Sequence, residues 1–345
     1  MARADRESTE WRRQRLGRNE VAFAITRAYH GFQRHRGLNS AAALAFFAAL
    51  AVFPASLSVV SIVALLDDRR RAPGDILRVI ASISPHSTTA ALKGPLQQLL
   101  SIPNPGYALA TGLILGIWTL SGYVTALGRT VNTAYEVQEG RRWIGLRARM
   151  LLVAGVLMIV GAAAALLLLG TPSVAAAVAH VSHVPAGVVT AWDIVKWPVL
   201  AVLAIFAVSI LYFFSPNIRH LRIRWATAGA LLAIVAWVLA TTGFAIYVLN
   251  LSHYNKTYGW LGGAVVLLLW LYLSNLVMVM GAEMDAELVR VRQLMAGIHA
   301  ERTIQLPVRS TRRIETLERW QKQDEHDGRL LRERADRRRN RASSD

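Results

Sequence analysis

The sequence predicts an all-α, polytopic membrane protein with six transmembrane helices and both termini in the cytoplasm. Hydrophobic residues make up 54% of the 345 positions, and the mean hydropathy is +0.34 although the formal net charge is +17. The charged residues are separated from the apolar stretches, whereas a soluble protein would intersperse them along amphipathic elements. Several of the apolar stretches approach or exceed the ~20 residues that cross a bilayer as a helix.

Residues 1–39 are predicted to form a cytoplasmic N-terminal segment. Its start is polar and charged, without the short apolar core and small-residue cleavage site of a signal peptide. Residues 19–38 form a helical stripe with arginines around it, made of Val21, Ile25, Ala28, Tyr29 and Phe32. Such a helix either lies in the membrane interface or is an ordinary solvated helix that leads into the first span.

Residues 40–283 are predicted to form the transmembrane domain, and its fifth span contains no charged residue. The predicted spans cover residues 40–66, 107–128, 150–170, 193–214, 225–249 and 259–281. Pro54 interrupts the first span, where a proline usually kinks a membrane helix. Polar groups within spans come from Tyr123, Tyr272, Ser274 and Asn275. Broken helices and polar groups at mid-bilayer are typical of transporter sites, so these five residues form a candidate cavity or kink.

The distribution of Lys and Arg predicts the orientation. With the N-terminus inside, 31 of the 39 basic residues fall on the cytoplasmic side and 6 on the opposite side. Residues 284–345 then form a charged, helix-prone cytoplasmic tail. Because basic residues at this surface face the bilayer and its anionic lipid head groups, the net charge needs no nucleic-acid partner. The tail also mixes 15 basic with 11 acidic residues, unlike a nucleic-acid-binding surface.

Acidic and polar side chains gather at the cytoplasmic ends of the second and sixth spans. Glu283, Asp285 and Glu287 follow the sixth span, while Arg129 and Asn132 end the second and share a helix face. Because charge at a span edge is costly, these five residues form a candidate polar site, with Arg129 paired to Glu283. The alternative is that Arg129 and Glu283 extend separately to the interface and fix helix depth.

Several chemistries find no pattern in the sequence. The chain has no Cys, which excludes disulfides and thiolate sites, and it has no phosphate loop, zinc-protease pattern or nucleophile elbow. His180 and His183 supply only two metal ligands, so no metal and no cofactor are predicted. The spacings Gly112-x-x-x-Gly116 and Gly259-x-x-x-Gly263 suit close helix packing within the chain or dimerisation, which leaves the oligomeric state open.

Four segments in chain order resemble the YihY/BrkB family of bacterial membrane proteins. They are Ala43-Leu44-Ala45-Phe46-Phe47 through Phe53-Pro54, Trp118-Thr119-Leu120-Ser121-Gly122 through Asn132-Thr133-Ala134-Tyr135, Phe213-Phe214-Ser215-Pro216-Asn217 with Arg224-Trp225, and Tyr258-Gly259 through Leu269-Trp270-Leu271-Tyr272 to Gly281-Ala282-Glu283-Met284-Asp285-Ala286-Glu287. The resemblance covers about residues 20–290. Two departures are Asp285, where the family often has Asn, and the tail beyond about 295, which matches no family pattern.

The resemblance implies a multi-pass protein of the bacterial plasma membrane. It also implies a link to envelope integrity, to virulence-associated serum resistance and, in some members, to export of envelope lipid. The expected function is therefore a non-enzymatic transporter, exporter or envelope-integrity factor, with a lipid or small-molecule substrate left open. The alternatives are a scaffold that acts through the C-terminal tail and a ribonuclease, which is an old label of the family.

Overall fold

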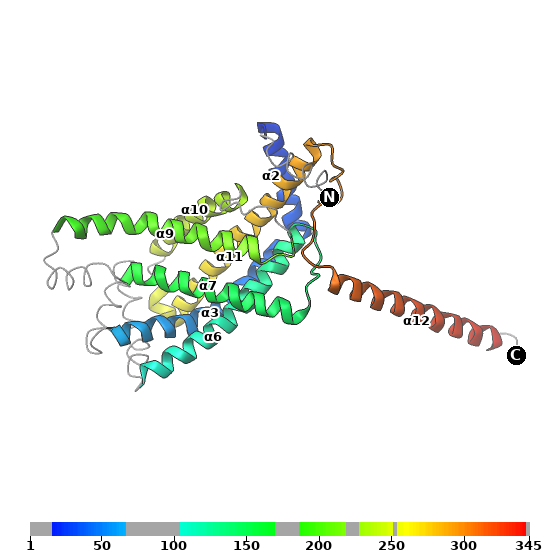
Figure 1. The fold of residues 1–345 in the computed structure, drawn as a ribbon, viewed down its shortest axis with the longest axis horizontal. Coiled ribbons are helices and arrows are strands. Elements are labelled where there is room, and N and C mark those ends of the chain that lie inside the picture. Colours follow the sequence, from blue (N-terminus) through cyan, green and yellow to red (C-terminus); the bar gives the residue numbers. More distant parts are fainter. Residues whose placement is uncertain (1–15, 67–103, 170–185, 219–227, 251–253, 343–345) are drawn as a thin grey trace.

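The computed structural model describes residues 16–66, 104–169, 186–218, 228–250 and 254–342, and most of these residues are helical (Figure 1). In chain order the helices are α2 (Arg18–Arg34), α3 (Gly37–Leu66), α6 (Pro105–Ala134), α7 (Trp143–Leu169), α9 (Ala186–Phe214), α10 (Ala228–Asn250), α11 (Tyr254–Met295) and α12 (Arg312–Ala342). Within the described ranges the only β contact is an isolated antiparallel bridge between Ile218 and Val308. The predicted all-α class is confirmed.

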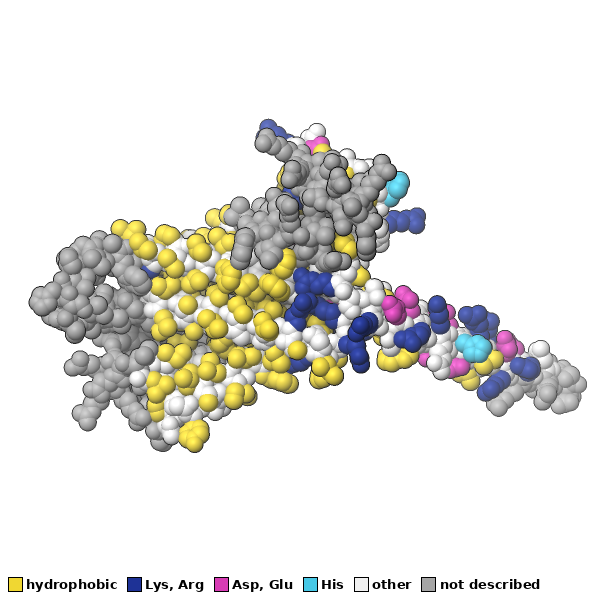
Figure 2. Space-filling view, in the orientation of Figure 1, with side chains coloured by type: hydrophobic (Ala, Val, Ile, Leu, Met, Phe, Trp, Pro, Cys, Tyr) yellow, Lys and Arg dark blue, Asp and Glu magenta, His cyan; other side chains and the backbone are white. Residues whose placement is uncertain are grey.

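Six of these helices lie side by side as a bundle and coincide with the six predicted spans (Figure 1). Five of them, α3, α6, α7, α9 and α11, are long and apolar enough to cross a membrane. In α10 the fully described stretch, Ala233–Val248, is shorter, but the whole helix has 23 residues and no charged side chain. On the face seen in Figure 2, the described surface of the bundle carries many apolar side chains and few charged ones, as lipid contact requires.

Glycines allow the closest approach between α3 and α6. A Cβ at Gly112 would lie 2.7 Å from Ser58 Oγ and 3.1 Å from the Pro54 carbonyl oxygen, and one at Gly116 would collide with Met158 of α7. The Gly112–Gly116 pair therefore serves packing within the chain. Gly263 has nothing within 4 Å of an added Cβ. The Gly259–Gly263 spacing therefore remains compatible with packing within the chain and with dimerisation. α3 continues as one helix through Pro54, whose carbonyl oxygen accepts a hydrogen bond from Ser58.

The cytoplasmic end of the bundle carries a compact structure, here called the cap, from which α12 projects (Figure 1). The cap comprises α2, the end of α6 with residues 135–142, residues 215–218, the end of α11 from residue 283, and residues 296–311. α11 continues without a break across the predicted domain boundary at 283/284. The first part of the predicted tail therefore belongs to the cap, and α12 alone extends from it.

α2 packs on the inner end of α11 through a small-residue face. Ala24 and Ala28 are buried against Met284, Leu288 and Val291 of α11. In the predicted stripe, Ala28 and Phe32 are thus buried by protein, whereas Ile25 and Tyr29 are more than half exposed. The interfacial position of this helix stays a prediction, and the exposed pair is the part of the stripe that remains available to lipid.

Candidate functional site

The three carboxylates of α11 are buried in the cap. Glu283 is 2% exposed, Asp285 6% and Glu287 2%. Burying an ionised carboxylate is costly unless cations or hydrogen-bond donors compensate it. Each of the three has such a partner, and the partners come from different parts of the chain.

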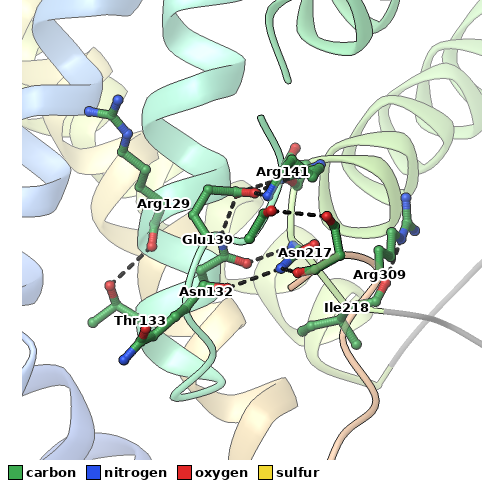
Figure 3. A network of polar contacts seen from close by, with 12 residues as sticks. Arg129, Asn132, Thr133, Glu139, Arg141, Asn217, Ile218 and Arg309 are labelled. Carbon is green, nitrogen blue, oxygen red and sulfur yellow. Dashed lines mark hydrogen bonds and ion pairs between the residues drawn. The ribbon is translucent and has the colours of Figure 1, made fainter. Parts of the chain in front are cut away.

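Glu283 binds α2 and not α6. Its Oε1 lies 2.9 Å from Nδ1 of His35, and its Oε2 has no hydrogen-bond partner among the described residues. A Cβ at Gly31 would lie 2.7 Å from that free oxygen, so the glycine allows the two helices to approach closely. The predicted pairing of Arg129 with Glu283 is wrong. Arg129 is exposed and its guanidinium points away from the polar network around Asn132 (Figure 3).

Glu287 joins two arginines. Its Oε2 accepts hydrogen bonds from Nε of Arg27 at 3.0 Å and from Nε of Arg290 at 2.9 Å. Arg290 is fully buried, with Nη2 2.9 Å from Glu136 Oε1 and Nη1 donating to the Ala300 carbonyl oxygen at 2.6 Å. Arg290 therefore links α11, the turn after α6 and the segment after α11.

Asp285 faces away from the other two acids, as its helical position requires. Its Oδ2 accepts a hydrogen bond of 2.8 Å from the Tyr135 hydroxyl. The three carboxylates thus do not converge, and the described part of the chain contains no group of three or more His, Cys, Asp or Glu residues arranged to hold a metal ion. The residues His180 and His183 lie outside the described ranges.

A second buried network connects the end of α6 to the end of α9 (Figure 3). Asn132 donates through Nδ2 to Glu139 Oε2 at 3.0 Å, and its Oδ1 accepts the backbone N–H of Asn217 at 2.7 Å. Nδ2 of Asn217 donates to the carbonyl oxygens of Gln138 and Ser310, both at 3.0 Å. Asn132 and Asn217 together therefore connect three cap segments.

Glu139 and Arg141 form a two-pronged ion pair beside this network. Arg141 donates from Nε to Oε1 at 2.8 Å and from Nη2 to Oε2 at 2.6 Å. Burial by itself raises the pKa of the Glu139 carboxyl, but the hydrogen bonds and charge of Arg141 and the Asn132 amide outweigh burial, so the pKa lies below its usual value of 4.5. Glu139 is therefore ionised at neutral pH.

Three arginines line one pocket of about 530 Å³ next to this pair. Arg141 comes from the loop after α6, Arg149 from α7 and Arg309 from the segment before α12, with Phe213 and Phe214 of α9 as apolar neighbours. Burial, and then the charges of Arg149 and Arg141, lower the pKa of Arg309 to about 10. Sequence reasoning treated these arginines only as topology determinants, because nothing local indicates that they converge.

The polar residues predicted within the spans make contacts between helices. The Tyr123 hydroxyl donates to Asn275 Oδ1 at 2.9 Å, and Trp237 Nε1 donates to Ser274 Oγ at 2.9 Å. Tyr272 packs partly buried against the core, and Pro54 packs near Gly112. The structure therefore joins Tyr123 with Asn275 but does not gather all five residues, and none of them lines the pocket above.

The family model described as "Virulence factor BrkB" matches residues 28–303, which include the bundle and most of the cap. The ribonuclease-like protein YfkH of Bacillus subtilis is 30% identical over 264 residues, covering 75% of this chain and 93% of that protein. A UPF0761 membrane protein of Tolumonas auensis is 28% identical over 193 residues, covering 55% of this chain and 60% of its own.

A UPF0761 membrane protein of Alteromonas mediterranea is 37% identical over 101 residues, covering 29% of this chain and 34% of its own. No solved structure matches this chain. With its apolar helix bundle and a match over most of its length, the chain is a multi-pass membrane protein that belongs to the virulence factor BrkB family.

Proposed function

We propose that this chain is a non-enzymatic transporter or exporter of the bacterial plasma membrane, gated at its cytoplasmic end. An envelope-integrity role would then follow from the movement of an envelope component. The observation that carries the proposal is that α2 and the residue after it are attached to α11 by two contacts, the hydrogen-bond contact His35–Glu283 and the ion pair Arg27–Glu287. Ionisable groups within membrane proteins that are buried against other helices often mark functional sites.

The position of α2 gives these two contacts a mechanical role. α2 ends at Arg34 and α3 begins at Gly37, so only His35 and Arg36 separate the extra-membrane helix from the first span, and Arg36 is in a left-handed conformation with φ of 53°. Breaking the two contacts would release α2 from the sixth span while it stays attached to the first. A buried ion pair often adds little net stability. Its better documented role is to favour one arrangement of the helices over another.

The test is transport by purified protein in liposomes, with a labelled lipid in one arm and labelled small solutes in the other. We expect protein-dependent movement of one class, altered by Glu283→Gln and unchanged by Arg129→Gln, since Arg129 is exposed and outside these contacts. No movement above protein-free liposomes, with folded protein confirmed in the same vesicles, would contradict transport. Equal rates in the two variants would contradict the gate.

The second candidate function is a scaffold, favoured by the exposure of α12. Leu317, Trp320 and Leu331 of this helix are 42%, 60% and 64% exposed, and the helix projects away from the cap (Figure 1). The discriminating variant deletes residues 312–345 and keeps Arg309 and Ser310, which bind the cap. A transporter should keep its phenotype after this deletion, whereas a scaffold should lose it.

A further inference from the structure

The pocket between α7, the end of α9 and residues 308–310 has an excess of positive charge. Of its three arginines only Arg141 has a carboxylate partner, Glu139. Arg309 uses Nε and Nη2 on the carbonyl oxygens of Ile218 and Phe213, at 2.6 and 2.7 Å, which orient its guanidinium without neutralising it. Arg149 is exposed and makes no hydrogen bond or ion pair with the described residues. Two positive charges are left uncompensated.

One buried donor in this pocket is also unsatisfied. Arg141 is 7% exposed, and its Nη1 has no hydrogen-bond partner in the described part of the chain. A buried donor without a partner is costly, and more so when it is charged. Its persistence next to two uncompensated cations indicates a site arranged for an anion.

Two of the three arginines, Arg141 and Arg309, are held in place before any ligand arrives. Arg309 donates its backbone N–H to the Asn217 carbonyl oxygen at 2.9 Å, and Ser310 Oγ donates to the Gly140 carbonyl oxygen at 2.9 Å. A Cβ at Gly140 would collide with the Ser310 carbonyl oxygen, so only glycine permits this approach. Arg309 also lies over the Phe213 ring, 5.4 Å from its centroid. Fixed guanidinium groups lose little entropy when they bind an anion.

The pocket lies where the bilayer surface is expected. Phe213 and Phe214 are the last residues of the apolar stretch Ile194–Phe214, and Arg149 lies in the first third of the stretch Trp143–Leu168. Figure 2 shows basic side chains at the place where the apolar surface of the bundle ends. A ligand held here would have its anionic group at the inner membrane surface.

We propose that Arg141, Arg149 and Arg309 form a binding site for a phosphate monoester at the inner membrane surface. A monoester carries a charge of about −1.5 to −2 at neutral pH, which matches the surplus of the pocket. Each guanidinium group can donate two parallel hydrogen bonds to two phosphate oxygens. A carboxylate has only two oxygens, so it would satisfy fewer of the donors in this pocket. This binding site is separate from the contacts between α2 and α11, and its existence does not depend on transport.

The experiment measures binding to the full-length protein in detergent. The probes are short-chain phosphatidic acid, phosphatidylglycerol and phosphatidylcholine of equal chain length, and inorganic phosphate. Arg149→Gln removes a pocket cation that has no structural partner, and Arg142→Gln removes an exposed neighbouring arginine that does not line the pocket. We expect phosphatidic acid to bind most tightly of the probes. Its affinity should fall about tenfold in Arg149→Gln, because one charged hydrogen-bonding partner is lost.

The control and the phosphate arm decide between outcomes. Arg142→Gln should bind phosphatidic acid like the parent. Displacement of phosphatidic acid by inorganic phosphate, with the same dependence on Arg149, would support the phosphate site and identify free phosphate as a source. Binding of the lipid alone would support the site and identify a lipid head group. Equal weakening by both substitutions, or binding of neither phosphatidic acid nor inorganic phosphate, would overturn the proposal whether or not the protein transports anything.

Discussion

Arg290 has no exposed surface, yet it carries a full charge in the middle of the cap. It lies between Glu287, Glu136 and the Ala300 carbonyl oxygen, while Glu287 also binds Arg27 of α2. Two cations and two carboxylates thus alternate through the cap, so that each charge has an opposite neighbour. Removing any one member would leave a buried charge uncompensated, which is why this cluster constrains the arrangement of the helices more than it stabilises them.

At the residue scale we predict that His35 and Glu283 are energetically coupled. Glu283→Gln and His35→Ala should each destabilise the protein, by up to about 3–5 kcal/mol if the site stays as buried as it is here. The double variant should lose less than the sum, because the second substitution removes a group that has already lost its partner. Denaturant unfolding in detergent gives the cycle, with Arg129→Gln as a variant that should stay within about 0.5 kcal/mol of the parent. Additive single effects would contradict the pair.

We also predict a contribution of Glu139 to stability that disappears in acid. Its pKa is lower in the folded chain than its usual value of 4.5, so the folded state favours the ionised form. The stabilisation is therefore complete above the usual value and is lost as the pH falls through the lower, folded-state pKa. Melting of the parent and of Glu139→Gln, from about pH 7 to about pH 3, should show a difference in Tm that shrinks below the usual value.

The control for this titration is Glu318→Gln, which removes an exposed carboxylate of α12 outside the cap network. A parent–Glu139→Gln difference that stayed constant over the whole range would show that the ion pair with Arg141 does not act through ionisation.

At this scale the sequence identified the acidic residues but not their partners. Helical spacing tells which residues share a face, and Arg129 and Asn132 do lie one turn apart. It does not tell where along that face burial begins, and here Asn132 is 3% exposed while Arg129 is exposed. The partner of Glu283 comes from 248 positions earlier in the chain, on a helix whose contact with α11 no local pattern indicates.

At the scale of elements the prediction is much better, because membrane spans follow from hydropathy within one continuous segment. Each of the six predicted spans coincides with a helix of the structure, apart from residues 170 and 225–227, which lie outside the described ranges. The errors concern the ends. α6 continues to Ala134 and α11 to Met295, because hydropathy detects where the apolar stretch ends and not where the helix ends. These extensions form part of the cap, which was therefore not predicted as a structure.

Close contacts between elements lead to a prediction about glycines. A Cβ at Gly128 of α6 would lie 2.8 Å from the carbonyl oxygen and 3.2 Å from Cβ of Ser215, just after α9. Because backbone cannot move aside easily, Gly128→Ala should destabilise the protein by about 1–3 kcal/mol. Gly155→Ala on α7 meets nothing within 4 Å and should be neutral or stabilising by up to about 1 kcal/mol. Thermal unfolding of the two variants in one detergent would contradict the close packing if both behaved alike.

At the scale of the whole molecule, the arrangement of the cap and the basic residues agree with one orientation. α2, the inner ends of α6 and α11, and the start of α12 lie at the same end of the bundle (Figure 1). The segments assigned to that end hold 31 of the 39 Lys and Arg residues. An even number of spans with the basic end inside places both termini in the cytoplasm.

The orientation is testable because the chain has no cysteine of its own. Single cysteines at positions 142, 220 and 320 should be protected from a membrane-impermeant thiol reagent in intact cells, and a cysteine at position 185 should react. All four should react after the membrane is permeabilised, which controls for burial within the protein. A reactive cysteine at 320 in intact cells would reverse the assignment of the C-terminus.

The last prediction is that this protein has no nuclease activity of its own, although YfkH has a ribonuclease-like name. Metal-assisted hydrolysis needs several carboxylates that converge on an open coordination position. Here Glu283 and Glu287 are occupied by His35, Arg27 and Arg290. Asp285 faces the Tyr135 hydroxyl, on another side of α11. A divalent ion would first have to displace these partners from a buried cluster.

The basic surface of the cap can nevertheless attract RNA without cleaving it, through phosphate contacts that weaken as salt increases. The measurement is therefore turnover and not binding. Detergent-purified protein is incubated with tRNA and Mg²⁺ or Mn²⁺ beside a variant that combines Glu283→Gln with Glu287→Gln. We expect no turnover in either sample, or equal background in both from a copurified enzyme. Turnover in the parent that disappears in the variant, with both proteins folded, would mean that the buried acids of α11 are catalytic, and the enzyme class would replace the transporter class.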